Sequence, residues 1–269
     1  MNTLFPEEQS QKTFIVLDGA LINAPLLAYK YDDDPWFDQL YRGTRHAGAI
    51  EVSPCLIRPS GNSRFWEHQT EWGSFGVGIK TRVSAEKLIG HLRSLISVRL
   101  PNGQQSYCRF YSNKHLALLL DVFSDHEARS FSGPIFSWFS THPTAPFDEI
   151  QLDGCGECRN RDNEGWFQLS SKHLDALSHI RETEFSRKLC QHLGLQTDGK
   201  TIDAIKRLNL QAQQYGFISE REVATFVELA WGQDEHIHSS ACQRILNDGG
   251  ETAYQKLTAL DRQIAYGDA

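Results

Sequence analysis

The chain has 269 residues, of which 40% are hydrophobic and 23% are charged, so it is long enough for one large globular domain or two smaller ones. Its formal net charge of −7 argues against a nucleic-acid-binding protein, because neutralising phosphates requires clustered lysine and arginine. No apolar run reaches the roughly 18 residues of a membrane-spanning helix, and residues 1–13 lack the pattern of a secretory signal. We therefore expect six reduced cysteines, no membrane insertion and a cytoplasmic location.

The N-terminal segment predicts short strands and one short helix. Phe14–Leu17 is an apolar run followed by the turn-forming pair Asp18-Gly19, which is typical of a buried strand. Asn23 is placed to cap the helix that follows. Residues 52–57 predict a further strand, in which Pro54 indicates an edge position or an irregular start, because proline has no N–H to donate.

The segment from Trp72 to Phe123 predicts, in order, a turn, a helix, a turn, a strand and a helix. Ser84 is placed to cap the first of these helices, and Ser112 or Asn113 to cap the second. Tyr107–Tyr111 alternates in character, as a half-buried strand does. This segment is a packed α/β unit without a catalytic motif.

Aromatic residues gather after a turn at residues 131–135. Phe136, Trp138 and Phe139 fill a hydrophobic core in the simpler interpretation. In the alternative they form a protein-contact patch, because aromatic side chains are enriched at interfaces.

Residues 143–165 are rich in proline, glycine, aspartate and asparagine, and they end the first predicted domain. Ile150–Leu152 and Trp166–Leu169 are predicted to pair as a hairpin around the intervening loop. The predicted fold is therefore α+β, with a mixed α/β domain at residues 1–165 and a small all-helical C-terminal lobe at residues 166–269.

The C-terminal lobe is predicted to contain about four or five amphipathic helices joined by short turns. The first begins near Ser171. Ser219 and Glu222 fit a capping box, with Ile218 and Val223 placed for a hydrophobic staple.

Cys155 and Cys158 form a CxxC pair, the most enzyme-like feature of the sequence. A structural zinc site needs two more ligands. No second CxxC is present, and His236 and His238 would serve only if the helical lobe folded back onto this loop. Redox chemistry requires the pair at a helix start within a βαβ unit, whereas this pair lies in a polar loop. We therefore expect no metal and no cofactor.

Other catalytic motifs are also missing from the sequence. Gly73, Gly76 and Gly78 match neither phosphate-binding glycine pattern, so they predict tight turns and close backbone packing. The GxSxG and HExxH motifs are absent. We expect no enzymatic activity, although a Ser/His/Asp site assembled in space stays open.

A series of short motifs occurs in a characteristic order between residues 14 and 139: Leu17–Ala20, Leu40–Gly43, Ser53–Ile57, Trp72–Gly73, His91–Arg93, Arg109–Tyr111 and Phe131–Pro134. Together they resemble the adaptor (chaperone) proteins of bacterial type VI secretion, the Tap/Tec family, which share a domain long labelled as of unknown function. The sequence departs from the family pattern at Ser112-Asn113, where relatives often have Asp-Pro. Both pairs are suited to begin a helix.

The resemblance implies a non-enzymatic, cytoplasmic role. Such adaptors bind a specific toxic effector and promote its loading onto the VgrG spike, sometimes together with a PAAR-containing protein. The recognisable motifs lie in the first domain, so we expect this domain to be the common platform and the helical lobe to recognise the effector.

Five residues are candidates for partner binding: Arg109, Trp138, Phe139, Trp231 and Tyr254. Arg109 is chosen from the resemblance, with a structural or docking role, and the aromatic residues from their enrichment at interfaces. Two other functions stay open. One is a metal- or thiol-dependent enzyme that uses Cys155 and Cys158, and the other is a protein-interaction module outside secretion.

Overall fold

The computed structural model describes residues 10–142, 145 and 147–267, and the chain divides into two compact units at residues 1–177 and 178–269. The first unit contains sheets and helices, whereas the described part of the second is built of helices, which confirms the α+β class. The division falls later than the predicted 165/166 boundary, because Phe167 and Leu169 are buried in the core of the first unit.

A six-stranded antiparallel sheet forms the centre of the first unit, with strands in the order β2-β3-β1-β4-β7-β8. Two further strands form a separate antiparallel hairpin. The strands are β1 (Lys12–Leu17), β2 (Trp36–Gln39), β3 (Cys55–Arg58), β4 (Gly76–Thr81), β5 (Ser97–Arg99), β6 (Gln105–Tyr107), β7 (Ile135–Ser140) and β8 (Glu149–Gln151).

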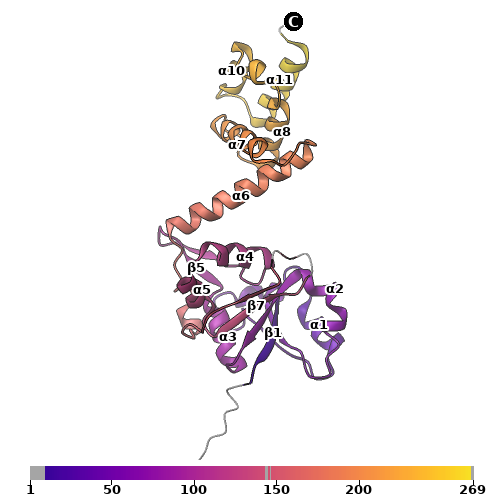
Figure 1. Ribbon diagram of the computed structural model, residues 1–269, viewed down its shortest axis with the longest axis vertical. Helices are drawn as coiled ribbons and strands as arrows, with labels where there is room; N and C mark the ends of the chain where they lie inside the picture. Colours follow the sequence, from indigo (N-terminus) through magenta and orange to yellow (C-terminus); the bar gives the residue numbers. More distant parts are fainter. Residues whose placement is uncertain (1–9, 143–144, 146, 268–269) are drawn as a thin grey trace, which may run out of the picture. The chain divides into compact units, whose positions relative to one another are not determined.

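Strand β1 is buried on both faces of the sheet, as its unbroken apolar run predicts. Phe14 and Val16 point into one core, and Ile15 and Leu17 into the other, because successive side chains of a strand alternate. Figure 1 shows α1 and α2 on one side of the sheet and α3 on the other. The helices are α1 (Ala24–Tyr31), α2 (Gln69–Trp72), α3 (Ala85–Ser94), α4 (Asn113–Val122), α5 (Asp125–Ser132) and α6 (Ser171–His192), the last of which runs on into the second unit.

Strand β4 occupies a stretch that the sequence predicts to be a turn, so that prediction is wrong. The close backbone packing predicted for its glycines is confirmed. A Cβ on Gly78 would lie 2.1 Å from ring atoms of Phe139, and a Cβ on Gly76 would lie 2.2 Å from the carbonyl oxygen of Val16. Both distances are far below van der Waals contact, so only glycine lets the chain come this close to its neighbours.

Two other strand predictions are wrong in part. Strand β6 ends at Tyr107, and Phe110 and Tyr111 beyond it are buried without belonging to a strand. Ile150 pairs with Trp138 of β7 rather than with residues 166–169. A local hydrophobic pattern does not specify which distant strand completes a sheet.

Strand β3 lies between β2 and β1, so it is not an edge strand. Pro54 immediately precedes it, which agrees with the irregular start that the sequence also allows. The predicted helix caps hold at Asn23 and Ser84, whose side chains accept hydrogen bonds from Leu26 N and Lys87 N.

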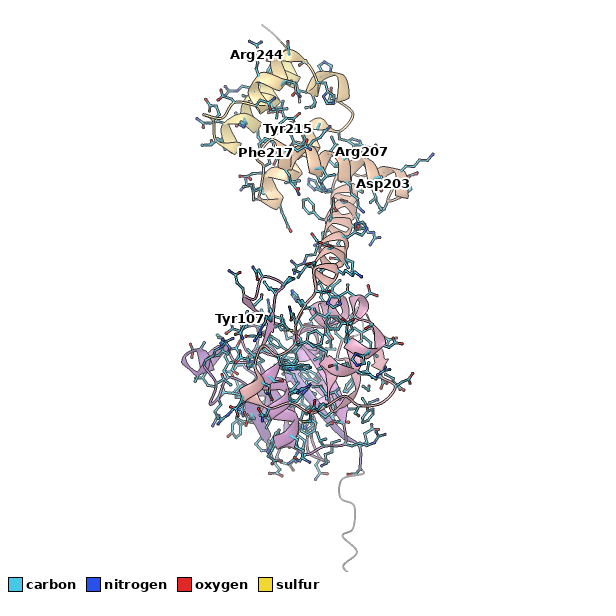
Figure 2. All side chains as sticks on the ribbon, turned by 90° about the vertical axis from the view of Figure 1, so that its left-hand side faces the viewer. Tyr107, Asp203, Arg207, Tyr215, Phe217 and Arg244 are labelled. Atoms are coloured by element: carbon cyan, nitrogen blue, oxygen red, sulfur yellow. The ribbon has the colours of Figure 1, made fainter. Side chains whose placement is uncertain are left out.

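The second unit packs the end of α6 with α7 (Gly199–Gln214), α8 (Glu220–Ala230), α9 (Asp234–Ile237), α10 (Ser240–Leu246) and α11 (Ala253–Tyr266). Phe217 and Phe226 are fully buried in its core, and Figure 2 labels Phe217 there. The capping box of Ser219 and Glu222 is confirmed. The hydrophobic staple is wrong, because Ile218 is 90% exposed. Across the described residues, no helix combines the length and apolar character needed to cross a bilayer.

His91 of α3 is fully buried and connects three segments of the first unit. Its Nε2 lies 3.0 Å from the carbonyl oxygen of Phe131, and its Nδ1 accepts a hydrogen bond from Arg159 N at 3.2 Å. Nδ1 can accept only when it carries no proton, so this geometry requires a neutral ring. Burial lowers the pKa of His91 to about 4.

The neutral state of His91 makes the stability of the first unit depend on pH. Because the folded-state pKa lies below the unfolded value of about 6.5, the unfolded chain binds the extra proton first as the pH falls between these values. Because of His91, the unfolding free energy of the first unit should fall by about 2 to 3 kcal/mol when the pH is lowered from 7 to 4.5.

The native chain and the His91→Gln variant should therefore differ in how their unfolding free energy changes with pH. The glutamine amide donates and accepts hydrogen bonds but does not titrate in this range. Urea unfolding at several pH values measures this difference. The stability advantage of the native chain should shrink as the pH falls. A difference that stays constant over this range would contradict the neutral, buried histidine.

Candidate partner-binding surfaces

Arg109 forms an ion pair with Asp18 at the end of β1. Arg109 Nη2 lies 2.5 Å from Asp18 Oδ2, and the Asp18 side chain is only 4% exposed. The other carboxylate oxygen of Asp18 accepts a hydrogen bond from Ala20 N at 3.0 Å. The guanidinium thus neutralises a buried carboxylate and ties the segment before α4 to the sheet. Arg109 has a structural role, with its side chain still 44% exposed.

Trp138 and Phe139 of β7 do not form a contact patch. Trp138 is fully buried, and its Nε1 donates a hydrogen bond to Ser132 Oγ at 2.8 Å. Phe139 is half-buried against Gly78, with its ring 6.1 Å from that of Trp66. For these two residues the core-filling interpretation is the one that the structure supports.

Trp231 and Tyr254 lie in the second unit and differ in exposure. Trp231 follows α8 directly and packs, half-buried, against the helical core. Tyr254, in the first turn of α11, is 78% exposed. Of the five predicted partner-binding residues, Tyr254 is therefore the best placed to touch another protein.

Tyr254 lines a surface groove of about 770 Å³ between α8 and α11, which we call the α8–α11 groove. Leu229 and Leu257 supply further apolar surface. Thr225 lies one helical turn before Leu229 on α8, and Thr258 lies one helical turn after Tyr254 on α11. On α11 the lining residues lie at positions i, i+3, i+4 and i+7, and on α8 they recur once per helical turn, as expected for one face of each helix.

The charged residues of the α8–α11 groove are mostly acidic: Glu222, Glu228 and Asp261 against Arg221. The Glu222 carboxylate is fixed by the capping box, and hydrogen bonds from the N–H groups of Ser219 and Ile218 lower its pKa. Glu228 and Asp261 are exposed, and neither has an ion-pair partner in the described part of the chain. Sequence periodicity does not reveal this groove, because it forms only when α8 packs against α11.

The first unit has an exposed apolar surface on α1, where Leu26 and Tyr29, one helical turn apart, are 61% and 68% exposed, and Leu21 before the helix is 58% exposed. We call it the α1 surface. Leu21 lines a hollow with Pro25, Glu51 and Ser53. The sequence gives no sign of it, since Leu26–Tyr29 is apolar all round the helix and does not distinguish its buried face from its exposed one.

A polar cluster joins the turn after β2, the β5–β6 hairpin and the loop before α6. Glu164 Oε1 accepts hydrogen bonds from Arg45 Nη2 at 2.9 Å and Ser97 Oγ at 2.7 Å, and it lies 2.7 Å from His46 Nε2. The Tyr107 hydroxyl, labelled in Figure 2, lies 2.8 Å from His46 Nδ1. These contacts with one carboxylate oxygen hold the three segments together.

Cys155 and Cys158 are exposed free thiols. Their sulfur atoms face different elements, since Cys155 Sγ lies 3.8 Å from Pro134 O and Cys158 Sγ lies 3.5 Å from Lys87 O. Among the described residues, no group of three or more histidine, cysteine or acidic side chains is arranged to hold a metal ion. His236 and His238, the further ligands that the sequence suggests, belong to the other unit.

Residues 13–130 match the model of a family described as "Domain of unknown function (DUF4123)". The DUF4123 segment begins in β1 and ends in α5, and it includes both Asp18 and Arg109. No curated protein and no solved structure matches the chain.

Replacing Arg109 with alanine should destabilise the DUF4123 segment by about 2 kcal/mol, because the buried Asp18 carboxylate loses a charged hydrogen-bond donor. Urea unfolding followed by tryptophan fluorescence reports on this unit, since Trp231 is the only tryptophan outside it. Arg64→Ala is the matched control, because Arg64 is exposed and its guanidinium forms no ion pair within the described residues. Equal midpoints for the two variants would refute the structural role of Arg109.

Proposed function

We propose that this chain is a non-enzymatic adaptor that binds a type VI secretion effector and promotes its loading onto the VgrG spike. The observation that carries the proposal is the DUF4123 match over residues 13–130. It covers all but the last, Phe131–Pro134, of the motifs through which the sequence resembles the Tap/Tec adaptors, a family that shares a domain of unknown function.

An adaptor needs two contact surfaces, one for its cargo and one for the machine that receives it. Each unit has one: the α1 surface in the first and the α8–α11 groove in the second. We assign the α1 surface to the spike, which is the partner common to such adaptors, because it lies within the matched domain. We assign the groove to the effector.

Such a protein acts by binding its effector and the spike in the cytoplasm before export, and this binding requires no catalytic group. The polar clusters of the first unit suit this role, because the Asp18–Arg109 pair and the donors around Glu164 hold segments together. A PAAR-containing protein is a possible third member of the complex. Nucleic acid and membrane play no part in the proposed mechanism.

The thiol or metal enzyme is the second candidate, and it rests on the exposure of Cys155 and Cys158. Metal analysis of the purified chain and of its Cys155→Ser variant separates the two functions. Stoichiometric zinc that the variant loses would support the enzyme. We expect neither protein to contain zinc in stoichiometric amount.

Co-purification from cells that express the chain with its candidate effector and spike proteins tests the adaptor function. The native chain should retain both partners. Tyr29→Ala should weaken retention of the spike by about tenfold and leave the effector, and Tyr254→Ala should do the reverse, because exposed aromatic anchors dominate interfaces.

Tyr266→Ala is the control for this experiment, since Tyr266 is 82% exposed on α11 but does not line the groove. Retention of neither partner by the native chain would overturn the proposed function. Equal loss of both partners in each aromatic variant would overturn the assignment of the two surfaces.

A further inference from the structure

We propose that the α8–α11 groove binds an amphipathic helix that carries lysine or arginine on both flanks of its apolar face. This inference rests on the proposed function, in which the second unit recognises the effector. It adds the chemistry of the segment that is recognised.

The shape of the groove indicates a helical occupant. Its walls are two neighbouring helices, and on α8 the lining runs from Arg221 to Leu229. At 1.5 Å per residue this is roughly 12 Å, or two helical turns. An amphipathic helix lying along the groove contacts both walls through residues at i, i+3, i+4 and i+7 of its own apolar face.

The apolar part of the groove supplies the anchor points. Leu257 forms part of the floor and is 8% exposed, while Tyr254 stands at the rim at 78% exposure. Ile218, 90% exposed, directly precedes the lining residue Ser219. Exposing such large apolar side chains costs free energy in water, and a partner's apolar face would recover it.

The charges of the groove select the flanks of the occupant. Glu228 and Asp261 lie on opposite walls, both exposed and without an ion-pair partner in the part of the chain that the structure describes. Glu222 adds a third carboxylate, held in place by its capping hydrogen bonds of 3.0 Å. A helix with cations beside its apolar face satisfies both walls, whereas a helix with anions there is repelled.

A small molecule is a poorer fit to the same residues. Pockets that bind small molecules orient them with a few buried, convergent polar groups. Here Glu228 and Asp261 are exposed, and Thr225 and Thr258 are half-buried. Such a lining suits a long partner that contacts both walls.

A library of displayed 16-residue helices tests the inference on the full chain. The helices share a leucine and alanine face, and their flanking positions are drawn equally from lysine, glutamate and glutamine. Helices selected by the native chain should carry lysine over glutamate by about threefold to fivefold at these positions. The Glu228→Lys/Asp261→Lys variant should select glutamate instead.

The selected helices should bind the Tyr254→Ala variant about tenfold more weakly and the Tyr266→Ala variant as well as the native chain. Circular dichroism of each variant establishes that it is folded. No enrichment of lysine, the same enrichment with the charge-reversed variant, or equal binding to the Tyr254 and Tyr266 variants would overturn the proposal.

Co-purification of the effector with the charge-reversed variant separates this inference from the proposed function. If the native and charge-reversed chains retain the effector equally, the groove is not its site, and the adaptor function stands. If cationic helices are selected as expected but neither effector nor spike co-purifies with the native chain, the groove chemistry holds and the adaptor function falls.

Discussion

Burial of the central sheet on both faces is the constraint on which the rest of the structure depends. Strand β1 sends Phe14 and Val16 into one core and Ile15 and Leu17 into the other, so both faces must be covered. Trp138 is buried in one of these cores, so it cannot contact a partner. The surfaces open to a partner are therefore on the outside of the segments that cover the sheet, such as the outer side of α1.

The two units are stabilised by different kinds of interaction. In the first, Asp18–Arg109 and the hydrogen bonds of Glu164 hold together segments that are distant in the sequence, and neutral His91 joins α3 to the segment at Arg159. In the second, helices pack around Phe217 and Phe226 and are closed by local caps such as Ser219–Glu222. Polar contacts between segments distant in the sequence suit the rigid domain that we propose as the common platform. Locally capped helices allow their outer faces to differ without disturbing the core.

Several local features of this fold are predicted from the sequence, although not the exposure of Ile218, whereas the pairing of distant segments is not predicted. The caps at Asn23, Ser84 and Ser219 follow from residue type and spacing, and the structure has all three. The glycines of β4 suggest turns as well as close packing, so the strand itself is not predicted, and the ring of Phe139 that packs on Gly78 comes from a strand distant in the sequence. Among the candidate site residues, Tyr254 was predicted from its residue type alone. The carboxylates opposite it become neighbours only when α8 and α11 pack.

In the function proposed above, this chain bridges two other proteins without changing either of them chemically. Sedimentation velocity of purified effector and VgrG spike, with and without the chain, tests it most directly. The account predicts one complex containing all three proteins when the chain is added, and separately sedimenting effector and spike when it is left out. An effector that joins the spike equally well without the chain would contradict the account.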